Sequence, residues 1–258
     1  MRLLLLLLGT CFVLNASAQL SGTIVYEEKL TIDFGDKLDK VPEAQREQVM
    51  AMLEKMKEQT SLKELVFSPE ACLYRSKKAE ETDIDIESDG MQMKMVSSGS
   101  DQQVYRNLKE NEMIEQTEFL GKQFLIEDEV ETLPWKIETE TKKIAGYNCQ
   151  KAILINEEKN DTVTAWFTKQ LPIPAGPMVY GQLPGMILEI SQQQGNFVIT
   201  ATAVELAAID ASTLAAPTAG DKVSRKKYEK IVKAKMAEME EYSGGNGSGV
   251  QVDVRIER

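Results

Sequence analysis

The segment from Thr164 to Ile190, TAWFTKQLPIPAGPMVYGQLPGMILEI, constrains the fold more than any other part of this chain. Two strand-like runs flank a loop that contains many strand-breaking residues, which are Pro172, Pro174, Gly176, Pro177, Pro184 and Gly185. Because proline fixes its own φ and glycine admits positive φ, this loop has a defined shape. The apolar run from Met186 to Leu188 predicts a strand that is buried on both faces. The segment therefore predicts two sheet strands joined by a rigid loop.

Short strand-like runs recur on both sides of this segment. The predicted strands are Thr23–Glu27, Leu65–Phe67, Cys72–Tyr74, Val104–Arg106, Met113–Gln116, Phe124–Ile126, Trp135–Glu140, Ala152–Ile155, Thr162–Thr168, Met186–Ser191 and Phe197–Leu206. Turns are expected near Ser68-Pro69-Glu70 and Lys143–Gly146, since proline, glycine and polar residues gather there. Such spacing is typical of a meandering antiparallel sheet.

Two segments have helical rather than alternating periodicity. The first begins at Pro42 and runs to about Lys63, and the second runs from Ser224 to Tyr242. A glycine-rich turn and a last strand, Val250–Ile256, follow the second helix. The chain thus predicts an α+β fold, in which a large curved antiparallel β-sheet, half-barrel-like, packs against two amphipathic helices.

The N-terminus has the pattern of a secretory signal peptide. Arg2 precedes an apolar run that ends in Ala16-Ser17-Ala18, so cleavage is expected before Gln19. Lipidation at Cys11 is the weaker alternative. We therefore expect residues 1–18 to be removed and residues 19–258 to form a single domain in the periplasm or outside the cell, with no transmembrane segment after cleavage.

Charge and residue usage limit the possible chemistry. The net charge of −11 disfavours nucleic acid and anionic membranes as partners, since both bind basic surfaces. The chain has no histidine, which excludes Ser-His-Asp and Cys-His catalysis and zinc sites built on histidine. Phosphate-binding glycine loops and nucleophile elbows are also absent. The sequence therefore predicts a protein that is not an enzyme and needs no cofactor.

Two cysteines, Cys72 and Cys149, would remain after cleavage. An exported protein can form a disulfide between them, and the alternative is a pair of buried thiols. A second sulfur-rich pattern is Met91-Gln92-Met93-Lys94-Met95, whose three thioethers alternate along a predicted strand. Thioethers select Cu(I), so these methionines are candidate copper ligands, although inward packing is the simpler reading.

The second half of the chain resembles the GLPGLI family of secreted Bacteroidetes proteins. The resemblance rests on Ile144–Ala152, Thr164–Thr168, Pro174–Pro177 and the segment Gln182-Leu183-Pro184-Gly185-Met186-Ile187, in this order. Gln182 and Met186 depart from the motif, where the family has glycine and leucine. The resemblance implies an envelope protein of unknown function and supplies no catalytic residue.

These observations lead to three functional hypotheses. The first is a noncatalytic protein that binds an apolar ligand, a lipid moiety or a protein segment. Its candidate binding residues are Trp135, Trp166, Pro177, Tyr180, Leu183, Pro184 and Gly185, which combine the two tryptophans with the motif loop. The second is an accessory subunit that docks onto an outer-membrane transporter or envelope complex. The third is periplasmic Cu(I) binding through Met91, Met93 and Met95.

Overall fold

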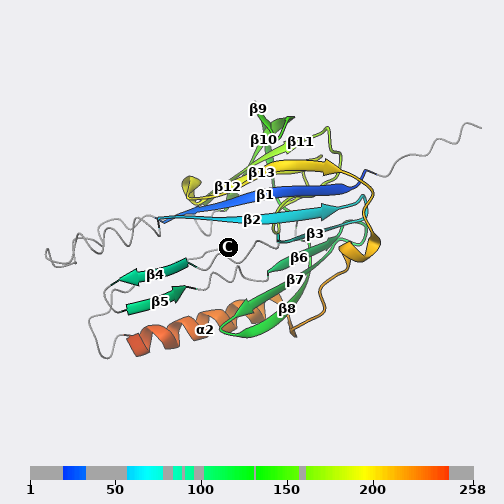
Figure 1. The fold of residues 1–258 in the computed structure, drawn as a ribbon. Helices are drawn as coiled ribbons and strands as arrows, with labels where there is room; N and C mark the ends of the chain where they lie inside the picture. The colour runs from blue at the N-terminus through cyan, green and yellow to red at the C-terminus, as the bar shows by residue number, and fades with distance from the viewer. Residues whose placement is uncertain are drawn as a thin grey trace, which may run out of the picture.

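The protein is mainly β. The computed structural model describes residues 20–32, 57–77, 84–88, 91–95, 102–130, 132–156 and 161–243. Twelve strands form one sheet in the order β14-β8-β7-β6-β3-β2-β1-β13-β12-β11-β10-β9 (Figure 1). Neighbouring strands are antiparallel, except that β14 runs parallel to β8. The sheet is not curled into a barrel, because β14 and β9 are its two edges.

The strands follow the predicted runs closely. Their bounds are β1 Gly22–Thr31, β2 Glu58–Phe67, β3 Ala71–Ser76, β6 Gln103–Asn107, β7 Glu112–Phe119, β8 Lys122–Glu129, β9 Lys136–Ile144, β10 Tyr147–Asn156, β11 Asp161–Thr168, β12 Met186–Gln192, β13 Phe197–Leu206 and β14 Asp221–Val223. The prediction of a large antiparallel sheet is confirmed. The turn at Ser68-Pro69-Glu70 also lies where the sequence places it, between β2 and β3.

One of the two predicted helices is confirmed. Helix α2 spans Arg225–Ser243 and lies beside β8 near one edge of the sheet (Figure 1). The helix expected from Pro42 to about Lys63 lies largely outside the described residues, and its last part is wrong because residues 58–63 belong to β2. Residues 58–63 pair with β1 along their whole length, and Lys63 also pairs with Ser76 of β3, so backbone pairing outweighs a weak helical pattern. The fold is therefore mainly β rather than α+β.

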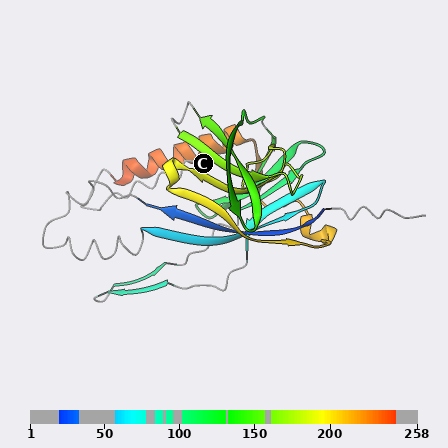
Figure 2. The same cartoon turned by 90° about the horizontal axis from the view of Figure 1, so that it is seen from above.

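Short elements complete the described part of the chain. Two 3-10 turns, η2 Gln193–Gly195 and η3 Ala211–Leu214, follow β12 and β13, and η3 lies against β2 and β3. A separate hairpin pairs β4 Ile84–Ser88 with β5 Met91–Met95 (Figure 2). The predicted signal peptide and the strand Val250–Ile256 lie outside the described residues. Among the described residues, no helix combines the length and hydropathy needed to cross a membrane.

The core joins the central strands to the loop between β11 and β12. Ile24 and Tyr26 alternate on β1 with exposures of 0%. Ile24 has apolar partners on both sides, and Tyr26 pairs with Ala201 of β13 and Lys63 of β2. The Tyr26 hydroxyl donates a hydrogen bond of 2.6 Å to the Ile187 carbonyl oxygen on β12. This bond crosses the interior, so it satisfies a buried phenol and ties two distant strands together.

Candidate functional site

The loop between β11 and β12 folds inward onto the core. Its apolar side chains Leu171, Ile173 and Leu183 are at most 3% exposed. The Met186 amide donates to Leu171 O and the Ile187 amide to Ala175 O, both at 2.9 Å. These buried side chains and hydrogen bonds hold the loop against the core, which agrees with the prolines and glycines along it.

Two residues at the end of this loop have unusual backbone angles. Gly185 has φ +156°, and a Cβ atom there would lie 2.1 Å from Thr168 O. Gln182 adopts φ +66°, so this residue itself takes the left-handed conformation expected of the glycine that it replaces. The motif therefore encodes a backbone path. Of the predicted binding residues here, Pro177, Leu183 and Gly185 are buried, whereas Pro184 is exposed.

Trp135 lies beside this loop, immediately before β9. Its indole Nε1 donates to Gly181 O at 3.0 Å, and its ring meets the Tyr180 ring edge-on with centroids 6.1 Å apart. The Leu133 amide donates to Gln182 Oε1 at 2.8 Å. We call Trp135, Tyr180, Gly181 and Gln182 the Trp135 site. Trp135 remains partly exposed, because only part of its surface packs on the core.

A residue that the sequence did not single out lies behind this site. Arg106 on β6 is 2% exposed, and its Nη2 donates to Gly176 O at 2.9 Å. Its Nε has no hydrogen-bond partner, and no described carboxylate forms an ion pair with it. A Cβ atom on Gly181 would lie 2.2 Å from Arg106 Nη1 and 2.9 Å from Pro174 O, so a side chain there would displace the guanidinium or the loop. The sequence signal that could have identified Arg106 is its alternation with Val104, because this alternation places both residues on the buried face of β6.

Trp166 belongs to a different cluster. It lies on β11 opposite Glu189 of β12, and the Lys142 ammonium sits 4.4 Å from the centre of its ring. Lys142 also forms a 2.7 Å ion pair with Glu189. This tryptophan is therefore covered by a cation of its own sheet, whereas the Trp135 ring meets Tyr180.

Polar side chains form a separate cluster on β1, β2 and β3. The Glu28 carboxylate accepts hydrogen bonds from Tyr74 at 2.7 Å and from Ser61 at 3.1 Å. Lys63 Nζ lies 3.6 Å from Glu28 and donates to Ser76 at 3.0 Å. Burial raises the pKa of Tyr74 well above its usual value, and the negative charge of Glu28 raises it further. The cluster neutralises its own charges, as a structural network does.

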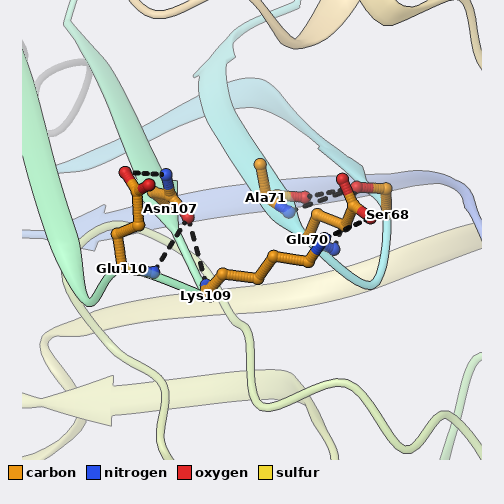
Figure 3. A network of polar contacts seen from close by, with 6 residues as sticks. All are labelled: Ser68, Glu70, Ala71, Asn107, Lys109 and Glu110. Carbon is orange, nitrogen blue, oxygen red and sulfur yellow. Dashed lines mark hydrogen bonds and ion pairs between the residues drawn. The ribbon is translucent and has the colours of Figure 1, made fainter.

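Two hairpin turns are fixed side by side at the end of the sheet (Figure 3). Lys109 forms a 2.6 Å ion pair with Glu70, and the Leu108 amide donates to Glu70 O at 2.8 Å. Ser68 caps its own turn by accepting from the Glu70 and Ala71 amides, and Asn107 does the same for Lys109 and Glu110. The side-chain amide of Asn111 in the second turn donates a hydrogen bond of 3.1 Å to Val130 O, shortly before the chain reaches the Trp135 site.

The cysteines and methionines occupy distinct places. Cys72 on β3 and Cys149 on β10 are both free and buried, and five strands separate β3 from β10 in the sheet order. The structure therefore lacks the predicted disulfide, and the alternative of two buried thiols describes it. Burial raises the pKa of Cys149 to about 11. Met91, Met93 and Met95 alternate along β5, which confirms the predicted strand.

The described residues contain no cluster of three or more histidine, cysteine, aspartate or glutamate side chains that could hold a metal ion.

Three comparisons place the chain among known proteins. A family model described as N-glycanase peptide, N-terminal domain (PNGase_F-II_N) matches residues 53–230. Two solved structures of PNGF-II, in space groups P21 and C2, match the fold with TM-scores of 0.53 and 0.52 and identities of 19% and 18%. Each covers 83% of this chain, which spans about a third of their length, 33% and 32% respectively. No curated protein matches the chain.

These findings correct the family and the functions expected from the sequence. The GLPGLI assignment is wrong, because the matching model belongs to the N-glycanase family and covers both halves of the sheet. The loop motif misled because it records a strand–loop–strand geometry around Gln182 and Gly185 rather than a function. The three functional hypotheses that went with it, apolar-ligand binding, envelope docking and Cu(I) binding, are overturned by the same match. The chain belongs to the PNGase F-II N-terminal domain family.

Proposed function

We propose that this chain is a noncatalytic domain that engages the glycan of an N-glycosylated protein. The observation that carries the proposal is the match of residues 53–230 to the N-terminal domain of an N-glycanase. PNGF-II is about three times as long as the part that this chain matches. A role in recognition, separate from bond cleavage, is consistent with a chain that corresponds to one domain of a longer enzyme.

The Trp135 site supplies a suitable contact surface. Sugars present C–H groups on their ring faces, and these groups pack well on flat aromatic rings. The indole of Trp135 is held in place by its hydrogen bond to Gly181 and by the Tyr180 ring. A ring that is already fixed loses little conformational entropy when a ligand binds. Trp135 is therefore a better anchor than Trp166, whose ring is occupied by Lys142.

The ionisable groups favour recognition over catalysis. The chain has no histidine, the commonest general base near neutral pH. Hydrogen bonds from Ser212, Lys122 and Lys136 lower the pKa of Asp210, Asp221 and Glu138 respectively, so these carboxylates are already engaged by neighbouring residues. The Glu28 carboxylate is held by three neighbours. Together with the predicted signal peptide, these features fit an exported protein that binds glycoproteins outside the cytoplasm.

Tryptophan fluorescence during titration with a neutral N-glycan oligosaccharide tests the proposal. We expect Trp135→Ala to weaken binding by about tenfold, from the loss of one aromatic contact. Trp135→Phe retains a ring and should retain most of the affinity, which separates binding from folding. Trp166→Phe is the matched control and should bind as the unmodified protein does. Equal losses in the two phenylalanine variants, or no loss in Trp135→Ala, would contradict the assignment.

A further inference from the structure

The outer face of helix α2 carries a cluster of basic residues. The first eleven residues of α2 contain six basic residues and one acidic residue, Glu229. Lys226, Lys230 and Lys233 recur at spacings of four and three, so they lie along one face. All three are exposed, and none has an ion-pair partner among the described residues. Lys227 flanks them and is also exposed.

The opposite face of the helix is the one that packs on the sheet. The Tyr228 ring meets the Phe124 ring of β8 edge-on, with centroids 5.3 Å apart. Arg225 forms ion pairs with Glu115 at 2.6 Å and with Asp128 at 3.4 Å. Tyr228 lies two residues from both Lys226 and Lys230, about 200° around the helix, so the lysines point away from these contacts.

Nearby carboxylates do not cancel this positive face. Glu127 pairs with Lys222 at 2.7 Å and Asp221 with Lys122 at 2.9 Å. Glu115 and Asp128 are engaged by Arg225. These four carboxylates of β7, β8 and β14 are thus matched by other cations. Glu229 lies three residues after Lys226 and four before Lys233, and it leaves the lysine face with a net positive charge.

Helix stability does not explain this charge pattern. The first turn of α2 has no acidic residue and the last turn has no basic residue. Because the helix dipole places partial positive charge at the N-terminus, basic residues there destabilise the helix. Lys226 lies in this first turn, and a cluster of basic residues on a protein whose net charge is −11 suits a negatively charged ligand.

We infer that the Lys226–Lys230–Lys233 face binds the carboxylate groups of acidic sugars at the ends of an N-linked glycan. The inference rests on the proposed function and names the class of glycan that the domain prefers. The three Cα atoms span about 10 Å along the helix, so two or more carboxylates of a branched chain can be contacted at once. Exposed lysines contribute little singly, and their combined attraction falls as salt screens it.

The test compares a sialylated biantennary N-glycan with its desialylated form by calorimetry at about 50 mM and about 500 mM NaCl. We expect the unmodified protein to prefer the sialylated glycan by about tenfold at low salt, and to lose this preference at high salt. The variant Lys226→Glu/Lys230→Glu/Lys233→Glu should abolish the preference. Only Lys226 lies in the first turn, so the unfolding temperature should change little, and its measurement checks that the variant is folded.

The matched control carries the same change of charge elsewhere, in Lys77→Glu/Lys143→Glu/Lys169→Glu. These three exposed lysines have no ion-pair partner among the described residues, and their reversal should leave the preference intact. Equal losses in both triple variants would overturn the inference, as would equal binding of a DNA duplex at the same charge concentration. If the two glycans bind equally well, the lysine face is not a carboxylate site although glycan binding stands. If neither glycan binds, both the inference and the proposed function are wrong.

Discussion

Arg106 and Gly176 are joined by a 2.9 Å hydrogen bond from the guanidinium Nη2 to the carbonyl oxygen, and this bond fastens the β11–β12 loop onto the sheet. The cation is buried without a carboxylate partner among the described residues, and its Nε is unsatisfied. Such a buried charge costs several kcal/mol of solvation, which one hydrogen bond does not offset.

The first prediction concerns this residue. Arg106→Met fills a similar volume and removes the desolvated charge, so the free energy of unfolding should stay within about 1 kcal/mol or increase. Arg106→Ala leaves a cavity and should lower it by about 2–4 kcal/mol. Urea denaturation of both variants measures the difference. A methionine variant as unstable as the alanine variant would show that the guanidinium has a stabilising partner.

Gly185 and Gly121 provide a matched pair for backbone strain. Both have positive φ, but a Cβ atom at 185 would meet Thr168 O at 2.1 Å, whereas a Cβ atom at 121 would meet nothing within 4 Å. Gly121→Ala should cost about 1 kcal/mol of stability, from backbone strain alone. Gly185→Ala should cost about 3 kcal/mol or more, because the strand end or the loop must move. Similar melting temperatures for the two variants would refute the close approach.

Buried tyrosines predict a loss of stability at alkaline pH. Burial raises the pKa of Tyr26 and Tyr74 well above the usual value and that of Tyr180 to about 12. Folding therefore favours the neutral phenols. Their contribution is complete below about pH 10, where unfolded tyrosine ionises, and it is lost as the pH rises through the folded-state values. Absorbance at about 295 nm should show these three ionising only with unfolding, and titration of every tyrosine near pH 10 in the folded protein would contradict their burial.

The two thiols should be present and unreactive. Cys149 has its pKa raised to about 11 by burial, so almost none of it is thiolate near neutral pH. A thiol reagent should label neither Cys72 nor Cys149 in the native protein and should label both after denaturation, without added reductant. An intact mass lower by two hydrogens, with no labelling of the denatured protein, would instead indicate a disulfide.

Most of the sheet follows from local sequence pattern. Alternation identifies β1, β3, β6, β8 and β13, and the turn at Ser68-Pro69-Glu70 sets the β2–β3 hairpin. The error at residues 58–63 arises because the pattern there is weak and pairing with β1 decides the conformation. Strand order is a long-range property, so whether Cys72 and Cys149 are free or bridged was not predictable from spacing.

The candidate site was only partly predictable. Trp135 and Tyr180 stand out because aromatic residues beside a rigid loop are good anchors, and the structure brings these two together. Trp166 is also an aromatic residue near this loop, so the sequence favoured it equally as an anchor. The register of β11 against β12 instead puts it beside Glu189 and Lys142. Arg106 was missed because a cation on an inward strand position runs against the usual preference for apolar residues.

The central claim, glycan recognition without glycan release, can be tested with one glycopeptide. Binding of the protein to an N-glycosylated peptide and to the same peptide lacking its glycan is measured by interferometry, and the glycopeptide is then recovered for mass spectrometry. We predict binding that depends on the glycan, together with a glycopeptide of unchanged mass. Equal binding of both peptides would contradict glycan recognition, and a peptide that has lost its glycan would show that the domain is catalytic.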